Sequence, residues 1–305
     1  MSDNRPQVAV LLAAYNGINW IEEQVVSILA QAHVDVSIYI SIDSSSDGTE
    51  AWCSECARKH ANVHVLPPAG PFGGAAPNFF RLIRDVDVSA FDYISFADQD
   101  DVWYPDKLDR AVSKLRSDEI DGYSSNVVAF WSSGRRVLVN KAQPQVKWDY
   151  FFEAAGPGCT YVLTQRLARA FQSAVNEHWS KVQSVMLHDW LCYAYARSAG
   201  FKWYIDPVPG MDYRQHANNQ VGVNAGVASA ISRVRQVWQG WWFAQVRLIC
   251  ELTASENSQN TVAKILARPG RFSLFRLIMH ASECRRRSRD QLVFAAFCGL
   301  SAFRR

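Results

Sequence analysis

Apolar runs and amphipathic stretches alternate along the first 115 residues of the chain. The continuous apolar run Val8–Ala14 predicts a strand covered on both faces, and apolar-rich stretches predict further strands at Val36–Ile42, Val63–Leu66 and Tyr93–Ala97. Apolar residues at helical spacing predict helices between and after them, at Trp20–Gln31, Thr49–His60, Asn78–Arg84 and Lys107–Leu115. This alternation predicts an α/β fold: a Rossmann-like, mostly parallel central sheet with helices on both faces.

The pattern changes from about residue 123. Val127–Trp131 and Arg136–Val139 predict a hairpin around Ser132-Ser133-Gly134. Helices are expected at residues 165–176 and 188–199, short strands at 203–205 and 211–216, and mostly helix after residue 225. We therefore expect an α/β domain over residues 1–225, with halves 1–122 and 123–225, and a helical basic extension over residues 226–305.

Composition and charge exclude several classes of protein. The chain has 305 residues, 49% of them hydrophobic, and a net charge of +3 that is too small to indicate a nucleic-acid partner. Its seven cysteines are odd in number and scattered, which is typical of reduced thiols in the cytoplasm. The N-terminus resembles no signal peptide, and no run reaches the roughly 20 apolar residues of a membrane span. We expect a cytoplasmic protein, or one at the inner face of the cytoplasmic membrane.

Acidic residues follow two of the predicted strands. Asp43 comes directly after the second strand, and Asp98 after the fourth, so both are expected at the crevice beyond the carboxyl ends of the strands. Asp98, Asp100 and Asp101 place three carboxylates within four residues. Such carboxylates repel one another unless a cation or solvent intervenes, and oxygen ligands favour Mg²⁺ or Mn²⁺. The alternative is a solvated acidic turn that caps the helix after Pro105.

No glycine-rich phosphate loop follows the first strand. The chain has neither a Walker A motif nor G-x-G-x-x-G at this point, where it has Tyr15-Asn16-Gly17. A phosphate-bearing ligand would therefore be held through a metal and side chains.

Three ordered segments, VAVLLAAYNG, SIDSSSDGT and FADQDDVWYPDKL, resemble glycosyltransferase family 2, whose members have the GT-A fold. The resemblance covers about residues 6–220, and Ser44 stands where the family usually has an acid or amide. It implies an inverting, metal-dependent glycosyltransferase that uses Mg²⁺ or Mn²⁺ and a nucleotide-diphosphate sugar.

The resemblance also implies roles for the strand-end residues. Ala14, Tyr15 and Asn16 would line the nucleotide pocket, and Asp43 would accept a hydrogen bond from the base. Asp98 would lie near the ribose and phosphates, Asp100 would bind the metal, and Asp101 would hold the metal's waters or the donor sugar.

The second half of the chain matches the family's catalytic base at Asp189, in His188-Asp189-Trp190. A carboxylate here could take the proton of the attacking acceptor hydroxyl, and a helix N-terminus favours its ionised form. The alternative is that Asp189 only caps its helix. Gly156, Gly158 and Cys159 resemble the family's acceptor-side loop.

A run with the pattern R-x-H-x-N-N, beginning at Arg214, resembles a rhamnosyltransferase-like bacterial branch that builds cell-surface polysaccharides. By this resemblance Arg214 would offset the diphosphate charge and His216 would be a further metal ligand. The alternative for His216 is an ordinary surface loop. The implied reaction moves a sugar, with rhamnose as the candidate, to a hydroxyl of a saccharide acceptor, a polysaccharide precursor that could be lipid-linked.

Residues 271–305 interleave eight arginines with bulky apolar residues, against Glu283 and Asp290 as the acidic residues. Basic amphipathic helices of this kind can lie on anionic membranes, which would suit a lipid-linked acceptor. The alternative is a helical appendage that packs on the catalytic domain and has a solvated basic face.

Two other functions were weighed against the glycosyltransferase. A nucleotidyltransferase would need a glycine-rich basic loop after the first strand, which the chain lacks. A non-catalytic nucleotide-sugar binding protein would not need the full acidic set, Asp43, Asp98, Asp100 and Asp189.

Overall fold

The computed structural model describes residues 5–216, 241–253, 261–267 and 270–303. The described residues form two compact units. The first comprises residues 5–142, 156–189 and 201–216, and the second comprises 143–155, 190–200 and the described residues from 241 onward. The predicted domain boundary at residue 225 lies outside the described residues and stays a prediction.

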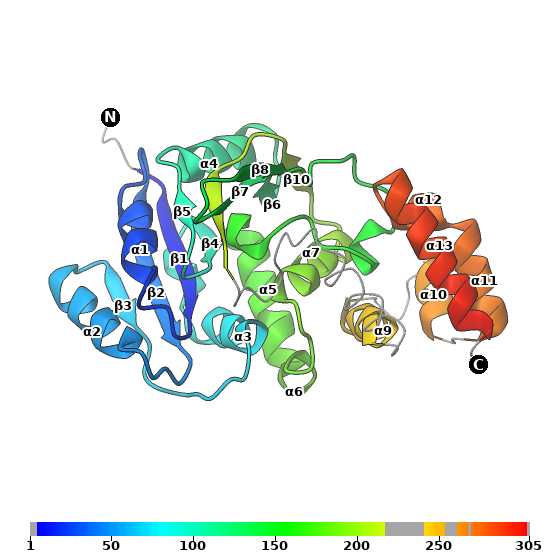
Figure 1. The fold of residues 1–305 in the computed structure, drawn as a ribbon, viewed down its shortest axis with the longest axis horizontal. Coiled ribbons are helices and arrows are strands. Elements are labelled where there is room, and N and C mark those ends of the chain that lie inside the picture. Colours follow the sequence, from blue (N-terminus) through cyan, green and yellow to red (C-terminus); the bar gives the residue numbers. More distant parts are fainter. Residues whose placement is uncertain (1–4, 217–240, 254–260, 268–269, 304–305) are drawn as a thin grey trace. The chain divides into compact units, whose positions relative to one another are not determined.

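A seven-stranded sheet forms the centre of the first unit (Figure 1). Its middle strand, β1 (Gln7–Ala14), pairs in parallel with β2 (Asp35–Ile42) and β4 (Tyr93–Ala97). The full order is β10-β6-β9-β4-β1-β2-β3, with the remaining strands at β3 (Val63–Val65), β6 (Gly122–Ser125), β9 (Val162–Thr164) and β10 (Trp203–Asp206). Among the described strands of this sheet only β9 runs antiparallel to its neighbours. This confirms the prediction of a mostly parallel sheet.

Helices cover both faces of this sheet, as predicted. They are α1 (Ile21–Leu29), α2 (Thr49–Lys59), α3 (Ala75–Asp85), α4 (Lys107–Ser117), α5 (Gln165–Glu177) and the short α6 (Trp179–Val182). Side chains alternate between the two faces of a strand. Thus Val10 and Leu12 of β1 join the core with α1 and α4, whereas Leu11 lies on the face covered by α3 and α5.

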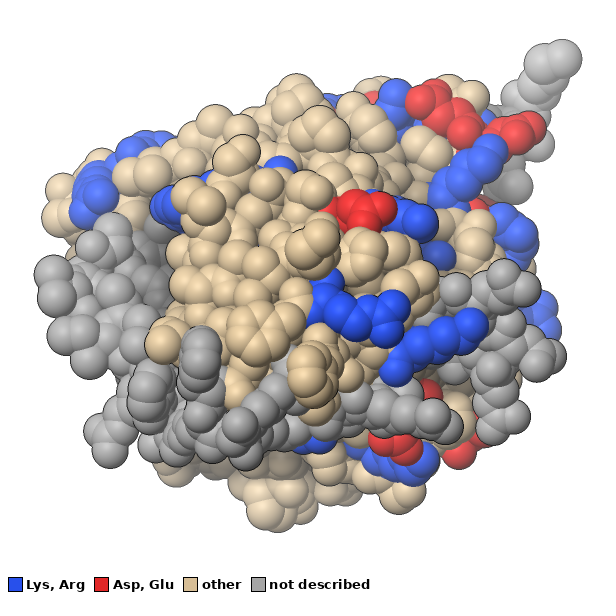
Figure 2. Space-filling model, turned by 90° about the vertical axis from the view of Figure 1, so that its right-hand side faces the viewer, with Lys and Arg blue, Asp and Glu red and all other residues tan. Residues whose placement is uncertain are grey.

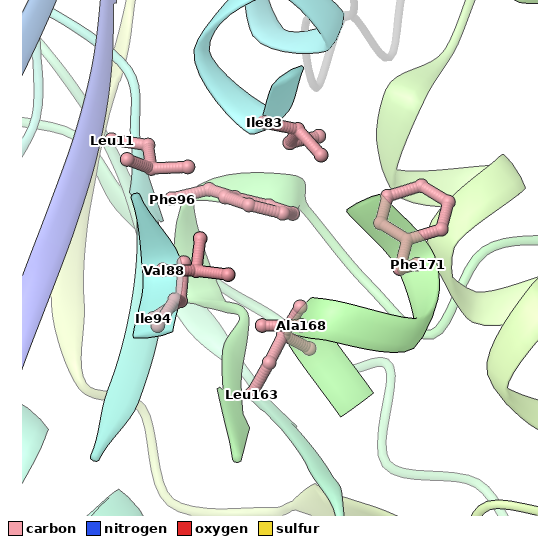
Figure 3. Close-up of a pocket in the computed structure, with 8 residues that line it drawn as sticks. All are labelled: Leu11, Ile83, Val88, Ile94, Phe96, Leu163, Ala168 and Phe171. Atoms are coloured by element: carbon pink, nitrogen blue, oxygen red, sulfur yellow. The ribbon is translucent and has the colours of Figure 1, made fainter. Parts of the chain in front are cut away.

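A small pocket lies between that second face and its helices (Figure 3). Its lining comes from β1, α3, the 3₁₀ turn Val88–Ala90, β4, β9 and α5, and consists of Leu11, Ile83, Val88, Ile94, Phe96, Leu163, Ala168 and Phe171. All eight side chains are apolar, so the pocket offers a polar ligand no partner, and we interpret it as space within the core.

A second sheet of the first unit has the order β5-β11-β7-β8. The predicted hairpin is confirmed as β7 (Val127–Trp131) and β8 (Arg136–Val139), which pair antiparallel. Strand β11 (Met211–Gln215) pairs with β7 and with the two-residue β5 (Val102–Trp103). Since β5 directly follows Asp101, this sheet brings Arg214 back to the acidic residues at the end of β4.

Helices dominate the second unit, in agreement with the prediction for the C-terminal region. α7 (His188–Ser198) passes into it from the first unit, and the described helices beyond residue 240 are α9 (Trp241–Thr253), α10 (Thr261–Ala267), α11 (Arg271–Met279), α12 (Ala281–Cys284) and α13 (Ser288–Phe303). Among the described residues, no helix is both long and apolar enough to span a bilayer.

A buried ionic network joins three segments of the second unit. The Asp149 carboxylate, from the 3₁₀ turn Asp149–Phe151, lies 3.3 Å from an Arg197 nitrogen and 3.7 Å from Nε of Arg286, and it accepts the Tyr193 hydroxyl at 2.9 Å. Burial alone would neutralise such a carboxylate, so the two guanidinium groups are what make its charge tolerable. The C-terminal helices therefore pack on residues 143–155 and on α7.

Candidate active site

The loop after β2 holds the turn that follows β1. Asn16 adopts a left-handed backbone conformation with φ of 45°, which turns the next N–H groups toward the neighbouring loop. Gly17 N–H donates to Thr49 Oγ1 at 2.8 Å, and Ile18 N–H donates to Asp47 Oδ2 at 3.0 Å. The loop SIDSSSDGT after β2 thus holds the Tyr15-Asn16-Gly17 turn after β1 in place. Asp47 and Thr49 therefore have a structural role in the site.

Gln99 joins the ends of β1 and β4. Its side-chain oxygen accepts the Tyr15 N–H at 2.7 Å, and its side-chain nitrogen donates to the Tyr15 carbonyl at 2.8 Å. A Cβ on Gly17 would lie 2.2 Å from the same side-chain oxygen, so a larger residue there would displace Gln99. The sequence pattern gives Gln99 no role, yet only an amide can donate and accept in this way. Gln99 thereby holds Tyr15 at the predicted nucleotide pocket, next to the buried Ala14.

Asp43 is buried at the end of β2. Its Oδ1 accepts the N–H groups of Ser44 and Phe72 at 2.8 and 2.9 Å, and its Oδ2 accepts that of Gly73 at 3.2 Å. The carboxylate therefore positions the loop that follows β3. Because each carboxylate oxygen has two acceptor sites, Oδ2 keeps one for a ligand, and the contact with a nucleotide base stays a prediction.

Asp98, Asp101 and Cys159 form the most buried part of the site. Their oxygen and sulfur atoms lie within 4.8 Å of one another, and both Asp101 and Cys159 are fully buried. Burial and the neighbouring Asp100 carboxylate raise the pKa of Asp98 to about 7, and they raise the pKa of Asp101 as well. Asp101 Oδ2 has no hydrogen-bond partner among the described residues. Such a cluster is relieved by a cation or a proton.

Lys107 is a buried cation beside this cluster. Its ammonium lies 3.3 Å from the centre of the Trp103 ring and finds no hydrogen-bond acceptor within the described part of the chain. Burial lowers the pKa of Lys107 to about 7, and the charges of Cys159 and Asp101 oppose that shift. In the sequence Lys107 only begins a predicted helix, because nothing in its local pattern marks burial.

The predicted metal ligands Asp100 and His216 lie together. His216 Nε2 is 2.6 Å from Asp100 Oδ2, although 116 residues separate them in the sequence. The Trp20 ring stacks on the imidazole at 4.2 Å between centroids and 15° between planes, which fixes the ring. Residues 217–219, the rest of the R-x-H-x-N-N run, lie outside the described residues.

Arg214 binds the backbone of the acidic turn. Its N–H donates to Asp101 Oδ1 at 3.1 Å, and its Nε donates to the Asp100 carbonyl at 2.7 Å. The guanidinium also pairs with Glu23 of α1, which the sequence analysis did not single out. A donor diphosphate would have to share Arg214 with Glu23, so the predicted diphosphate contact stays a prediction.

Asp189 lies in the first turn of α7, after the buried His188. The His188 ring stacks on Phe79 with centroids 3.7 Å apart and meets the edge of Phe96 at 5.6 Å. Burial lowers the pKa of His188 to about 3, so the imidazole is neutral at pH 7. Asp189 lies next to Gly158, which precedes Cys159 of the acidic cluster, and its charge is one cause of the raised pKa of Asp98.

Gly158 leaves just enough room for the start of α7. A Cβ on Gly158 would lie 2.6 Å from His188 Nε2 and 3.0 Å from Asp189 Cβ. Gly156 also needs to be glycine, because its φ is +142°. The predicted acceptor-side loop, Gly156 to Cys159, is therefore packed directly against the predicted base.

Gly158→Ala is expected to lower kcat by tenfold to about a hundredfold, because the added methyl displaces His188 and Asp189 from their positions. The KM for the donor should change little, since the nucleotide-side residues are untouched. Steady-state kinetics would measure both. Gly270→Ala is the matched control, because a Cβ there meets nothing within 4 Å. Equal kinetics for the two variants would contradict this packing role.

A family model decides what kind of site this is. The model described as "Glycosyltransferase like family 2" matches residues 6–209, which include every strand of the first unit up to β10. The chain belongs to this family. It is therefore a glycosyltransferase, and the nucleotidyltransferase alternative has no support.

One family member and two solved structures sharpen the comparison. The chain is 45% identical over 250 residues to the dTDP-rhamnosyl transferase RfbG of Shigella flexneri, covering 82% of this chain and 86% of the relative. It also matches S. aureus TarS 1-349 in complex with UDP-GlcNAc, with a TM-score of 0.57 and 13% identity over 98% of this chain and 89% of that one. The mannosyltransferase PcManGT from Pyrobaculum calidifontis, in complex with GDP-Man and Mn2+, has a TM-score of 0.52 and 14% identity over 98% and 86%. The two structures confirm the GT-A fold of this glycosyltransferase.

Proposed function

We propose that the chain transfers rhamnose from dTDP-rhamnose to a hydroxyl of a cell-surface polysaccharide precursor, with inversion at the anomeric carbon. The observation that supports the proposal is the packing of Gly158, which precedes Cys159 of the acidic cluster, against Asp189: a Cβ on Gly158 would lie 3.0 Å from Asp189 Cβ. The choice of rhamnose and of the dTDP nucleotide rests on the 45% identity to a dTDP-rhamnosyl transferase over most of both chains.

The proposed donor site includes Mg²⁺ or Mn²⁺. The residues fit such an ion, since carboxylate oxygens with one imidazole nitrogen suit Mn²⁺ and the buried Asp101 Oδ2 has no hydrogen-bond partner among the described residues. Asp100 and His216 would hold it, with Asp98 at the ribose and phosphates and Asp101 at the metal's waters or the donor sugar. A bound divalent ion supplies positive charge against the donor diphosphate.

In the proposed reaction Asp189 accepts the proton of the acceptor hydroxyl as its oxygen attacks the anomeric carbon. The bond from that carbon to the diphosphate breaks in the same displacement, and dTDP leaves. Arg214 offsets part of the charge that develops on the leaving group. The helix N-terminus beneath Asp189 favours the carboxylate before the reaction, and His188, neutral and wedged between two phenylalanines, holds that helix end in place.

We further propose that the acceptor is lipid-linked and that the enzyme works in the cytoplasm at the inner face of the cytoplasmic membrane, with residues 271–305 as the contact. All seven cysteines are buried thiols, which suits a reducing compartment. The basic, apolar character of residues 271–305 suits a membrane contact.

A thermal-shift panel of nucleoside diphosphates and nucleotide sugars, with and without Mn²⁺, tests the donor. A ligand at about a hundred times its Kd adds about 2.7 kcal/mol of stability, enough to raise Tm by several degrees. We expect dTDP and dTDP-rhamnose to stabilise the protein, and to do so more strongly with Mn²⁺. Stabilisation by a different nucleotide, with none by dTDP, would refute the proposed donor.

A further inference from the structure

The outward side of α11 carries large apolar side chains. Phe272, Phe275, Arg276 and Met279 follow at spacings of three, one and three residues, so they lie on one side of the helix. Phe272 and Met279 are 87% and 82% exposed. A surface helix in water normally presents polar residues on this side, and single exposed apolar residues are common while stripes of them are not.

The outward side of α13 repeats this character. Arg289, Leu292, Val293, Ala296 and Leu300 are spaced by three, one, three and four residues, which again is one side of a helix. Leu292 is 75% exposed, and Val293 and Leu300 are about half exposed. The five residues include no acidic side chain.

These stripes are not needed to hold the two helices together. α11 and α13 pack against each other, and their buried side chains are a separate set: Leu274 and Leu277 on α11, and Phe294, Cys298 and Ala302 on α13. The helices therefore have an inward face that supplies the core of the second unit and an outward face that remains apolar in water.

The charged residues within the two stripes are basic, although Arg289 pairs with the neighbouring Asp290. Arg276 and Arg289 lie within the stripes, whereas Glu283 is bound to His280 and Asp290 to Arg289, both acids being only partly exposed. Figure 2 shows the side of the molecule on which Figure 1 draws α11 to α13: a broad area of uncharged side chains, with basic side chains and an acidic group near its centre. The stripes thus combine apolar and cationic side chains.

We propose that the outward stripes of α11 and α13 form a surface that docks peripherally on an anionic phospholipid bilayer. Phe272, Met279 and Leu292 would enter the boundary between headgroups and acyl chains, while Arg276 and Arg289 meet lipid phosphates. A second copy of the chain fits less well, because a symmetric contact would bring arginines together without acidic partners in the stripes. This inference specifies the membrane contact proposed above for residues 271–305. It rests on the proposed function only in that a lipid-linked acceptor gives the enzyme a reason to bind the membrane.

Flotation of the full-length protein with phosphatidylcholine vesicles, with and without phosphatidylglycerol, tests the surface. We expect the wild type to float with the anionic vesicles and to be released by salt. The triple variant Phe272→Ser, Met279→Ser, Leu292→Ser should lose at least about tenfold in partitioning. Arg276→Gln with Arg289→Gln should lose about fivefold for each arginine. The control is Met186→Ser with Val26→Ser, which removes two exposed apolar side chains of the first unit.

The outcomes separate this surface from the catalytic assignment. Thermal stabilisation by dTDP and Mn²⁺ should be unchanged in all these variants, which also shows that they are folded. Failure of the wild type to float, equal flotation with neutral vesicles, or flotation of the stripe variants at the wild-type level would each overturn the docking surface. Self-association that the triple variant abolishes, without flotation, would assign the stripes to a second copy instead.

Discussion

Replacing Asp189 with asparagine is expected to abolish sugar transfer while donor binding stays within a few-fold of the wild type. The amide has the size and shape of the carboxylate but cannot take a proton from the acceptor hydroxyl. A positioned general base contributes on the order of 10²- to 10⁴-fold to the rate, so kcat should fall in that range. Donor binding should persist because Asp43, Asp100 and Arg214 are unchanged.

The control for Asp189→Asn is the same substitution at an aspartate in the first turn of another helix. Asp109 lies in the first turn of α4, just as Asp189 lies in the first turn of α7, and it has no part in the proposed site. Asp109→Asn should leave kcat near the wild-type value. If Asp189→Asn also kept near-normal turnover, Asp189 would be only a helix-capping residue, which is the alternative that the sequence left open.

In contrast to Asp189→Asn, Asp100→Asn is expected to impair donor binding itself. The proposed metal contact would be lost, so the dependence of donor binding on Mn²⁺ should disappear and kcat/KM should fall by on the order of a hundredfold or more. Isothermal titration of dTDP with and without Mn²⁺ would measure the binding change directly. His216→Gln should shift the same quantities in the same direction, because its Nε2 lies 2.6 Å from Asp100 Oδ2.

A histidine outside the site provides the control for His216. His60, at the end of α2, is exposed, so His60→Gln should leave the Mn²⁺ dependence unchanged. Retention of the full Mn²⁺ effect in Asp100→Asn would remove this residue as a metal ligand. Asp98 and Asp101, whose carboxyl groups lie close to Cys159, would then be the residues to examine.

The sequence predicted the central sheet well where burial alone determines the strand. β4 begins and ends at the predicted residues, and β1 and β2 differ from prediction by one residue at one end, because an apolar run buried on both faces has no other stable placement. β6 (Gly122–Ser125) escaped prediction because Gly-Tyr-Ser-Ser has no strand pattern of its own. It pairs with β9 and β10, about 40 and 80 residues later in the chain, and such pairing leaves no local signal.

In the candidate site, too, residues in local motifs could be predicted and residues that act through distant partners could not. The predicted acids, Asp98, Asp100, Asp101 and Asp189, come from motifs at strand and helix ends, and the structure brings them together with His216 and Cys159. Gln99, Trp20 and Lys107 were missed. Each acts through a partner far away in the sequence or through burial, and neither leaves a spacing pattern that a single chain reveals.

The most direct test of the account is release of dTDP from dTDP-rhamnose by the wild-type protein, with Mn²⁺ and a membrane extract that contains lipid-linked saccharides. The account predicts release that requires both Mn²⁺ and the extract, with rhamnose recovered in the lipid-linked fraction. Metal-dependent binding of dTDP-rhamnose without any release, under conditions in which the extract supports another rhamnosyl transferase, would contradict it and indicate a nucleotide-sugar binding protein.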